Sequence, residues 1–226
     1  MKKDAKSILA EKDRFSYVDA IALLDKGGEV SHCSEKGIIV SYEGLSSVVC
    51  FSGWQEMTPF IEDLNLVCVH DEGLRNWLIS HRGYKNEEGC RSFSWWQGRP
   101  AAPEGDFRTL DISFLDRISS VYSLADEKEL ASDLEKGNVF GLFIKGELAG
   151  FIGFHPEGSM GMLHVFDSYR RQGLGEKLER YDILTALSRN MIPYCHVFFS
   201  NEASLALQRK LGLSEGEKPV WWLWKD

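Results

Sequence analysis

The chain has 226 residues, a formal net charge of −8, 43% hydrophobic residues and 27% charged residues. This is the composition of an ordinary soluble globular protein, long enough for one large domain or two small ones with a proper core. The acidic balance and the lack of a run of lysines and arginines argue against a nucleic-acid or membrane surface, but they leave room for a local basic pocket that holds a phosphorylated ligand.

Cysteine and histidine spacing contains no recognisable metal or disulfide motif. The five cysteines are far apart and include no CxxC pair, and the six histidines form no HExxH motif. We therefore expect free thiols, no metal site and a reducing, cytoplasmic location. Charges interrupt the first 15 residues, MKKDAKSILAEKDRF, so this segment fits neither a signal peptide nor a membrane span.

The first hundred residues carry the patterns of an α/β domain. A hairpin that turns at Glu43 and Gly44 is predicted first, and a helix, a strand, a helix ended by a glycine, and a final strand follow it. The predicted segments are, in order, GIIVSYEGLSSVVCF, WQEMTPFIEDL, the strand and helix of LNLVCVHDEGLRNWLISHRGY, and SFSWW. The segment from Gln97 to Asp106 then combines proline, glycine and small residues, which is typical of a linker. We therefore expect domains at residues 1–100 and 106–226.

After the linker, the pattern predicts the order β, α, α, β, β, β, α, β, α, β. The corresponding segments are FRTLDIS, FLDRISSVYSL, DEKELASDLEKG, VFGLFI, ELAGFIGFH, GMLHVF, the segment from Gly173 to Asn190, IPYCHVFF, NEASLALQRKLG and VWWLW. Lys145 and Gly146 form a tight hairpin signal between two of the strands. The predicted fold class is α/β (α+β), with a mixed sheet covered by helices.

The two halves share part of this plan. LNLVCVHDEGLRNWLISHRGY and YCHVFFSNEASLALQRKLGL both read as a strand, a helix, a glycine and a hydrophobic residue, and SFSWW would match VWWLW. Two interpretations stay open, an ancient internal duplication and independent strand–helix–strand units that look alike.

The stretch YRRQGLGE, Tyr169 to Glu176, lies between a predicted strand and a predicted helix. A helix start leaves amide N–H groups without partners, and these amides and the helix dipole favour an anion. Gly173 and Gly175 let a diphosphate approach the backbone, while Arg170 and Arg171 add positive charge. Ordinary turn chemistry is the alternative. No P-loop motif and no GxGxxG motif is present in the sequence.

Val165, Arg170, Gly173 and Gly175 form the pattern VxxxxRxxGxG, and the strand CHVFF and the segment SNEASLALQRKLGL follow it. In this combination, residues 107–224 resemble the GNAT superfamily of acyl-CoA-dependent N-acyltransferases. YRRQGLG and HVFFSNEAS resemble its glycine N-acyltransferase branch most. The resemblance implies a GNAT-type, mainly antiparallel twisted sheet flanked by helices, with a divergent N-terminal half that would be a degenerate GNAT-like repeat.

The resemblance also implies how acetyl-CoA, or another acyl-CoA, would bind. Backbone groups of a splayed strand would pair with the pantetheine arm, and amides from Arg171 to Gly175 would hold the diphosphate. At the start of the next helix, Asn201 would bond the pantetheine arm, and Ser204 would reach the same arm or the phosphates. The implied binding residues are Leu163, His164, Val165, Arg170, Arg171, Gln172, Gly173, Leu174, Gly175, Asn201 and Ser204. A helix cap is the alternative for Asn201 and Ser204, and the side chain of His164 is expected to pack away from Val165.

The residues that handle the proton are less clearly marked. Gln208 stands where many family members have a tyrosine, and Ser159 stands where the glycine-acyltransferase branch has a glutamate. Glu157, two residues before Ser159, and His155, at the end of the preceding strand, are the candidate catalytic groups. A solvated hairpin is the alternative for both.

The resemblance implies an N-acetyltransferase that moves an acetyl or short acyl group from acyl-CoA to the amine of a small molecule, with amino acids among the candidates. The amine would attack directly in a ternary complex. The expected partners are this amine, no nucleic acid and no membrane, and the expected assembly is a monomer or a homodimer. Two alternatives stay open, a non-catalytic CoA-binding regulatory module and an N-acetyltransferase of proteins or peptides.

Overall fold

The computed structural model describes residues 2–225, which form two compact units, each with its own β-sheet. The first unit comprises the described residues of Met1–Trp95 and Tyr194–Asp226, and the second comprises Trp96–Pro193. Both sheets are flanked by helices, and the pairing of β3 with β4 is the only parallel pairing among the described strands. The predicted mixed, mainly antiparallel α/β architecture is therefore confirmed.

The first unit is built on a seven-stranded sheet in the order β1-β2-β3-β4-β11-β5-β10. Its strands are β1 (Glu29–Ser34), β2 (Gly37–Tyr42), β3 (Leu45–Cys50), β4 (Leu66–Val69), β5 (Asn86–Ser94), β10 (Tyr194–Phe198) and β11 (Ser214–Trp224). The predicted hairpin at Glu43 and Gly44 is confirmed, with φ angles of 45° and 85°. Trp95 and Trp96 lie after β5 and not within a strand, so the predicted strand SFSWW is shifted toward the N-terminus.

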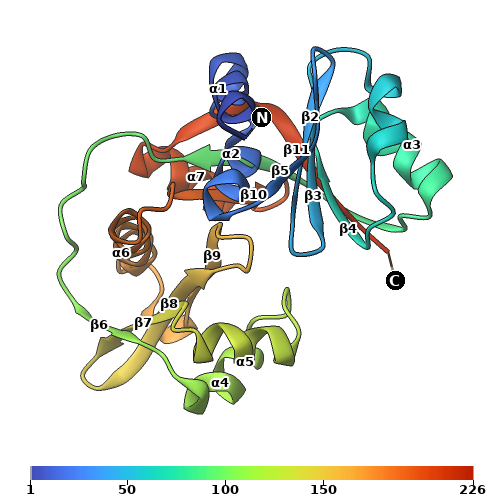
Figure 1. Ribbon diagram of the computed structural model, residues 1–226. Coiled ribbons are helices and arrows are strands. Elements are labelled where there is room, and N and C mark those ends of the chain that lie inside the picture. The colour runs from blue at the N-terminus through green and yellow to red at the C-terminus, as the bar shows by residue number, and fades with distance from the viewer. Residues whose placement is uncertain (1, 226) are drawn as a thin grey trace. The chain divides into compact units, whose positions relative to one another are not determined.

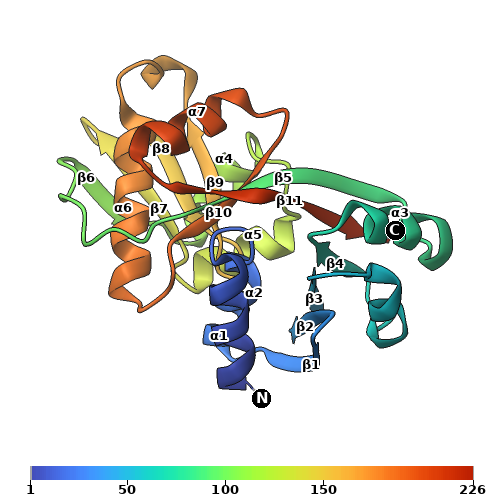
Figure 2. The ribbon, with the colours of Figure 1, turned by 90° about the horizontal axis from the view of Figure 1, so that it is seen from above.

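Helices cover both faces of β2, β3 and β4, with α1 and α2 on one side and α3 on the other (Figures 1 and 2). The helical elements of this unit are α1 (Lys2–Asp13), α2 (Val18–Lys26), η1 (Trp54–Phe60), α3 (Glu72–Arg82) and α7 (Glu202–Leu211). Leu74 and Leu78 of α3 share a buried core with Val67 and Val69 of β4. The predicted helix WQEMTPFIEDL is instead a 3-10 helix that contains Pro59, a residue that removes a helical hydrogen-bond donor.

The second unit is built on a four-stranded antiparallel sheet in the order β6-β7-β8-β9. Its strands are β6 (Asp106–Thr109), β7 (Val139–Ile144), β8 (Glu147–Phe154) and β9 (Met160–Val165). The predicted tight turn at Lys145 and Gly146 is confirmed, because both residues have positive φ angles, 52° and 84°, as a type I′ hairpin requires.

Helices also cover both faces of this sheet, as Figure 1 shows. The helical elements are η2 (Ile112–Phe114), α4 (Leu115–Ser119), α5 (Glu127–Glu135), η3 (Asp167–Tyr169) and α6 (Leu174–Ser188). Ile118 of α4 and Leu130 of α5 share a core with Phe151 of β8, and Leu178 of α6 approaches Gly150 on the other face. The predicted helix FLDRISSVYSL is much shorter than expected, because only Leu115–Ser119 is α-helical.

No helix among the described residues is long and apolar enough to cross a membrane. All five cysteines are free thiols, with Cys33 exposed and the other four buried.

Candidate functional site

Strand β9 is the edge of the four-stranded sheet, so its backbone pairs with β8 on one side and with no strand of that sheet on the other. A β-bulge interrupts this pairing, because Ile152 of β8 lies opposite both Met162 and Leu163. Met162 has a φ of 56°, which is rare for a residue with a long side chain. Bulges bend a strand and redirect its backbone groups, and they are common beside active sites. The backbone of β9 can therefore pair with an extended ligand.

The chain turns sharply after β9 and enters α6. Gly173 is the N-cap of this helix and has a φ of 76°, and Arg171 also has a positive φ, 61°. The amide N–H groups of residues 171–175 donate no hydrogen bond to any group of the described residues. A methyl group added at Gly173 would have no atom within 4 Å, so the space above the turn is open. The turn is thus a row of free amides at a helix N-terminus, which suits an anion.

Two exposed arginines flank the turn. Arg170 Nε donates to the carbonyl oxygen of Val165 at 3.1 Å, and Arg170 Nη2 lies 2.9 Å from Asp167 Oδ1. These contacts hold the Arg170 guanidinium between the end of β9 and the start of the turn. Arg171 and Gln172 are exposed and extend the polar rim. The sequence-predicted residues from Leu163 to Gly175 therefore lie in one continuous segment of the second unit, and their role in binding stays a prediction.

His164 packs its ring into the hydrophobic face of the sheet, as the strand pattern predicted. Its imidazole stacks on Phe151 at 5.5 Å between ring centroids and meets Phe166 edge-on at 5.1 Å. Burial, together with the positive charge of Arg170, lowers the pKa of His164. The side chain is thus a neutral packing group, and only the backbone of His164 can serve a ligand on the open edge.

Asn201 and Ser204 lie in the first unit, at the start of α7. Asn201 is the N-cap of this helix, and its side-chain Oδ1 accepts a hydrogen bond from the backbone amide of Ser204 at 3.1 Å. The cap leaves the Asn201 side-chain amide nitrogen as a further donor. Gln208, one helical turn farther on, is buried.

The β8–β9 turn brings both catalytic candidates to one end of the sheet. The Ser159 hydroxyl donates a short hydrogen bond to Glu157 Oε1, so the side chains at these two positions act as a pair. His155 bonds through its backbone to Ser159, and its ring lies over Gly161, where an added methyl group would meet Nε2 at 2.3 Å. Gly161 therefore makes room for the imidazole beside the first residues of β9.

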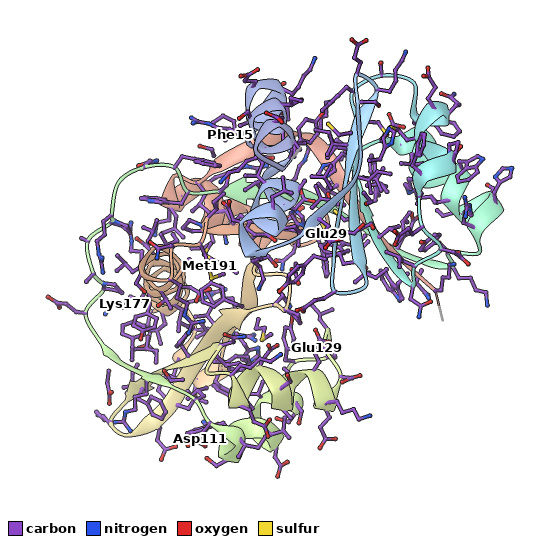
Figure 3. All side chains as sticks on the ribbon, in the orientation of Figure 1. Phe15, Glu29, Asp111, Glu129, Lys177 and Met191 are labelled. Atoms are coloured by element: carbon purple, nitrogen blue, oxygen red, sulfur yellow. The ribbon has the colours of Figure 1, made fainter. Side chains whose placement is uncertain are left out.

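Two carboxylates of α5 face this turn, and the sequence did not reveal them. Burial raises the pKa of both Glu129 and Asp133. In both groups, His155 lowers the pKa in part, and Glu157 raises it further. Asp133 is 1% exposed, and its Oδ2 has no hydrogen-bond partner among the described residues. Figure 3 labels Glu129 on α5. Glu129 and Asp133 are four residues apart, the spacing of one helix face, and this spacing is the signal that could have indicated them.

Comparisons with known proteins bear on the family and on the fold. Residues 106–213 match the family model described as acetyltransferase (GNAT) family. No curated protein matches the chain. Among solved structures, a protein from Drosophila is 17% identical, with a TM-score of 0.65, and the match covers 97% of this chain and 96% of that chain.

Two bacterial structures give similar values. A GCN5-related N-acetyltransferase from Kribbella flavida is 11% identical, with a TM-score of 0.55, and the match covers 93% of this chain and 95% of that chain. An acetyltransferase from the GNAT family from Colwellia psychrerythraea is 15% identical, with a TM-score of 0.52, and the match covers 85% of this chain and 82% of that chain. At such identities the likeness shows the fold, and the expected GNAT-type fold is confirmed.

Proposed function

We propose that this chain is an acyl-CoA-dependent N-acyltransferase that transfers an acetyl or another short acyl group to the amine of a small molecule, with amino acids among the candidate acceptors. The observation that carries the proposal is the row of free amides at residues 171–175, directly after an edge strand with a bulge. The match of residues 106–213 to the acetyltransferase (GNAT) family supports it.

The second unit contains groups that would bind two polar parts of acyl-CoA, the diphosphate and the pantetheine arm. The amides from Arg171 to Gly175 would hold the diphosphate, with Arg170 and Gln172 at its rim and Leu174 buried beneath it. The open edge of β9, from Leu163 to Val165, would pair with the amides of the pantetheine arm. The family resemblance assigns Asn201 and Ser204, at the start of α7, to the same arm.

The transfer needs a neutral amine, donors for the oxyanion and a group that accepts the amine proton. The amine nitrogen would attack the thioester carbon, the carbon–sulfur bond would break, and the thiolate would leave and take up a proton. A backbone N–H near Val165 would stabilise the oxyanion. Glu157, which is already paired with Ser159, would accept the amine proton directly or through a water, and His155 is the second candidate.

The carboxylates beside the turn also bear on the acceptor. Glu129, Asp133 and Glu157 create a negative potential around His155, which would attract an ammonium group before it loses its proton. We therefore favour an amine acceptor that does not carry several carboxylates, because these would neutralise the positive charge of its ammonium group.

A second candidate function is a CoA-binding regulatory module without catalysis. Gln208 and Ser159 favour it, because neither residue can replace the tyrosine and the glutamate that the family resemblance leads one to expect. The identity of the amine that accepts the acyl group would decide two further questions. These are whether the chain belongs with the glycine N-acyltransferase branch and whether it acts on proteins or peptides.

Release of free thiol from acetyl-CoA tests the proposal directly. The intact chain is incubated with acetyl-CoA and a panel of amines that includes amino acids, diamines and basic peptides, and a sample without amine measures hydrolysis. We expect amine-dependent release with at least one small amine. Acetyl-CoA binding without release across the panel would support the regulatory module instead, and release with peptides alone would support the protein acceptor.

A further inference from the structure

A second cluster of chemically active side chains lies in the first unit, on the side of its sheet that α2 covers. Asp19 of α2, Cys68 of β4 and His70, which directly follows β4, offer one ligand atom each, and these atoms all lie within 4.8 Å of one another. Cys68 and His70 are two residues apart on an extended segment, so their side chains point to the same face. All three residues are buried.

The contacts within the cluster converge on the Asp19 carboxylate. His70 Nε2 lies 3.1 Å from Asp19 Oδ1 and 3.2 Å from Oδ2, and Cys68 Sγ lies 3.4 Å from Oδ2. The Ser47 hydroxyl donates to the same Oδ2 at 2.6 Å.

Hydrogen bonding alone does not satisfy this carboxylate. Three donors crowd Oδ2, while Oδ1 has no hydrogen-bond partner among the described residues although His70 Nε2 is close to it. A nitrogen and an oxygen bound tetrahedrally to one zinc ion lie about 3.3 Å apart, and a sulfur and an oxygen about 3.6 Å, given the usual zinc–ligand bond lengths. The distances from His70 Nε2 and from Cys68 Sγ to the Asp19 carboxylate oxygens are close to these two values.

We propose that Asp19, Cys68 and His70 bind a zinc ion. One carboxylate, one imidazole and one thiolate are ligands that zinc accepts in proteins, and a thiolate argues against magnesium or calcium. A thiolate and a carboxylate together neutralise the divalent charge, so the bound site buries no net charge.

Two neighbouring side chains hold the proposed ligands. The Ser47 hydroxyl donates to the Asp19 carboxylate, and Tyr17 meets the His70 ring edge-on at 5.3 Å, whereas His70 Nδ1 has no hydrogen-bond partner among the described residues. A zinc ion bound by Asp19 and Cys68 would link α2 to β4. The zinc proposal does not depend on the proposed acyltransferase function.

Cobalt is a spectroscopic probe for the site, because a cobalt–thiolate bond absorbs in the near ultraviolet. The intact chain is stripped with a chelator and titrated with Co²⁺, and Zn²⁺ is then added. We expect one ion per chain, a thiolate-to-cobalt band that zinc abolishes, and a higher midpoint of thermal unfolding with zinc than without it. Elemental analysis of the protein as purified should show zinc.

Variants locate the ligand. Cys68→Ser should lose the cobalt band. Cys90→Ser, at a residue that is equally buried at 0% exposure, and Cys33→Ser, at the exposed cysteine, should keep it. A wild-type chain without a cobalt band and without a zinc-dependent thermal shift would overturn the proposal and leave a hydrogen-bond network only. A band that disappears in Cys33→Ser would overturn it too, because the ion would then be a surface contaminant.

Discussion

At the scale of single residues, Arg171 and Met162 adopt a backbone conformation that their side chains disfavour. Their φ angles of 61° and 56° lie in the left-handed region, which costs a residue other than glycine about 1–2 kcal/mol. Such strain is often found at functional sites, where it fixes the backbone groups that bind a ligand. Here both residues lie at the proposed acyl-carrier site, one at the bulge of β9 and one in the turn before α6.

Asp182 on α6 is a buried acid whose protonation should control stability. It is 0% exposed, and neither carboxylate oxygen has a hydrogen-bond partner among the described residues. Burial, and then the nearby Glu179, raise its pKa well above the ordinary value. A raised pKa in the folded state stabilises the fold below the unfolded pKa of about 4, and this stability is lost as the pH rises toward the folded pKa.

We therefore expect Asp182→Asn to raise the free energy of unfolding at pH 7 by about 1–3 kcal/mol, because the amide cannot ionise and so avoids the cost of a buried carboxylate that the wild type bears at this pH. Each tenfold change in proton affinity is worth about 1.4 kcal/mol. The gain should shrink toward pH 4, where the wild-type acid is protonated in the folded state and becomes protonated in the unfolded state as well. Thermal unfolding between pH 4 and pH 8 measures it, with Asp116→Asn, at an exposed position of α4, as the control. A stability difference that does not change with pH would contradict this assignment.

Glu157 should act on the chemical step and not on carrier binding. With Glu157→Gln we expect kcat to fall roughly 100-fold or more, the usual contribution of a general base, with the KM for acetyl-CoA unchanged. Steady-state kinetics measure kcat and KM, and Glu135→Gln, at an exposed position of α5, is the control. An unchanged kcat would move the base to His155.

The turn from Arg170 to Gly175 could be proposed from the sequence because its chemistry lies in one continuous stretch, and its role in acyl-CoA binding stays a prediction. Glu129 and Asp133 could not be connected with Glu157, because α5 and the β8–β9 turn meet only in the folded chain. The same holds for the proposed zinc ligands, since Asp19 is far in sequence from Cys68 and forms no known spacing with it.

At the scale of elements, the start of α7 combines a cap with a proposed ligand contact. Asn201 Oδ1 caps the helix, and the side-chain nitrogen would bind the pantetheine arm. Aspartate caps a helix as well as asparagine does, so we expect Asn201→Asp to keep the stability and to weaken CoA binding about tenfold, the equivalent of one lost hydrogen bond.

Calorimetric titration with CoA and thermal unfolding separate the two roles of Asn201. Asp71→Asn is the matched control, because Asp71 caps α3 in the same way, through the amide of Leu74 at 2.9 Å, and has no proposed ligand role. Wild-type CoA affinity in Asn201→Asp would leave Asn201 with the cap alone.

Elements with local signals were predicted well, and elements fixed by tertiary contacts were not. The turns at Glu43–Gly44 and Lys145–Gly146 need positive φ angles, and the glycine in each of them is a sequence signal for such a turn. The β9 bulge was not foreseen, because a methionine at its centre carries no turn signal. Helices α1 and α2 were also missed, since the first segment was considered only as a signal peptide or a membrane span.

At the scale of the whole molecule, two strand–helix–strand segments interlock in the first unit. Segment β4–α3–β5 and segment β10–α7–β11 contribute alternate strands to the order β4-β11-β5-β10. Each helix has an Asp or Asn N-cap and ends at a glycine with positive φ, Gly83 or Gly212. This exchange of strands supports the internal duplication, which stays a prediction.

The exchange also bears on the domain organisation. The proposed domains, residues 1–100 and 106–226, follow the linker in the sequence, whereas the compact units place the last two strands with the first 95 residues. The proposed domain boundaries therefore stay a prediction beside the two compact units. No local pattern in the sequence could reveal the exchange, because strand partners are chosen by long-range contacts.

The central claim is that the free amides of residues 171–175 bind the diphosphate of acyl-CoA. Calorimetric titration of CoA into the wild-type chain, Gly173→Asp and Gly146→Asp tests it most directly. Both glycines have positive φ angles, 76° and 84°, with open space where a side chain would begin, and aspartate tolerates this conformation better than most residues.

The two variants thus share the same backbone strain, and only Gly173→Asp places a negative charge over the turn. The account predicts that Gly146→Asp binds CoA like the wild type and that Gly173→Asp binds it at least tenfold more weakly. Equal CoA affinity in all three proteins, or no CoA binding by the wild type, would contradict the account.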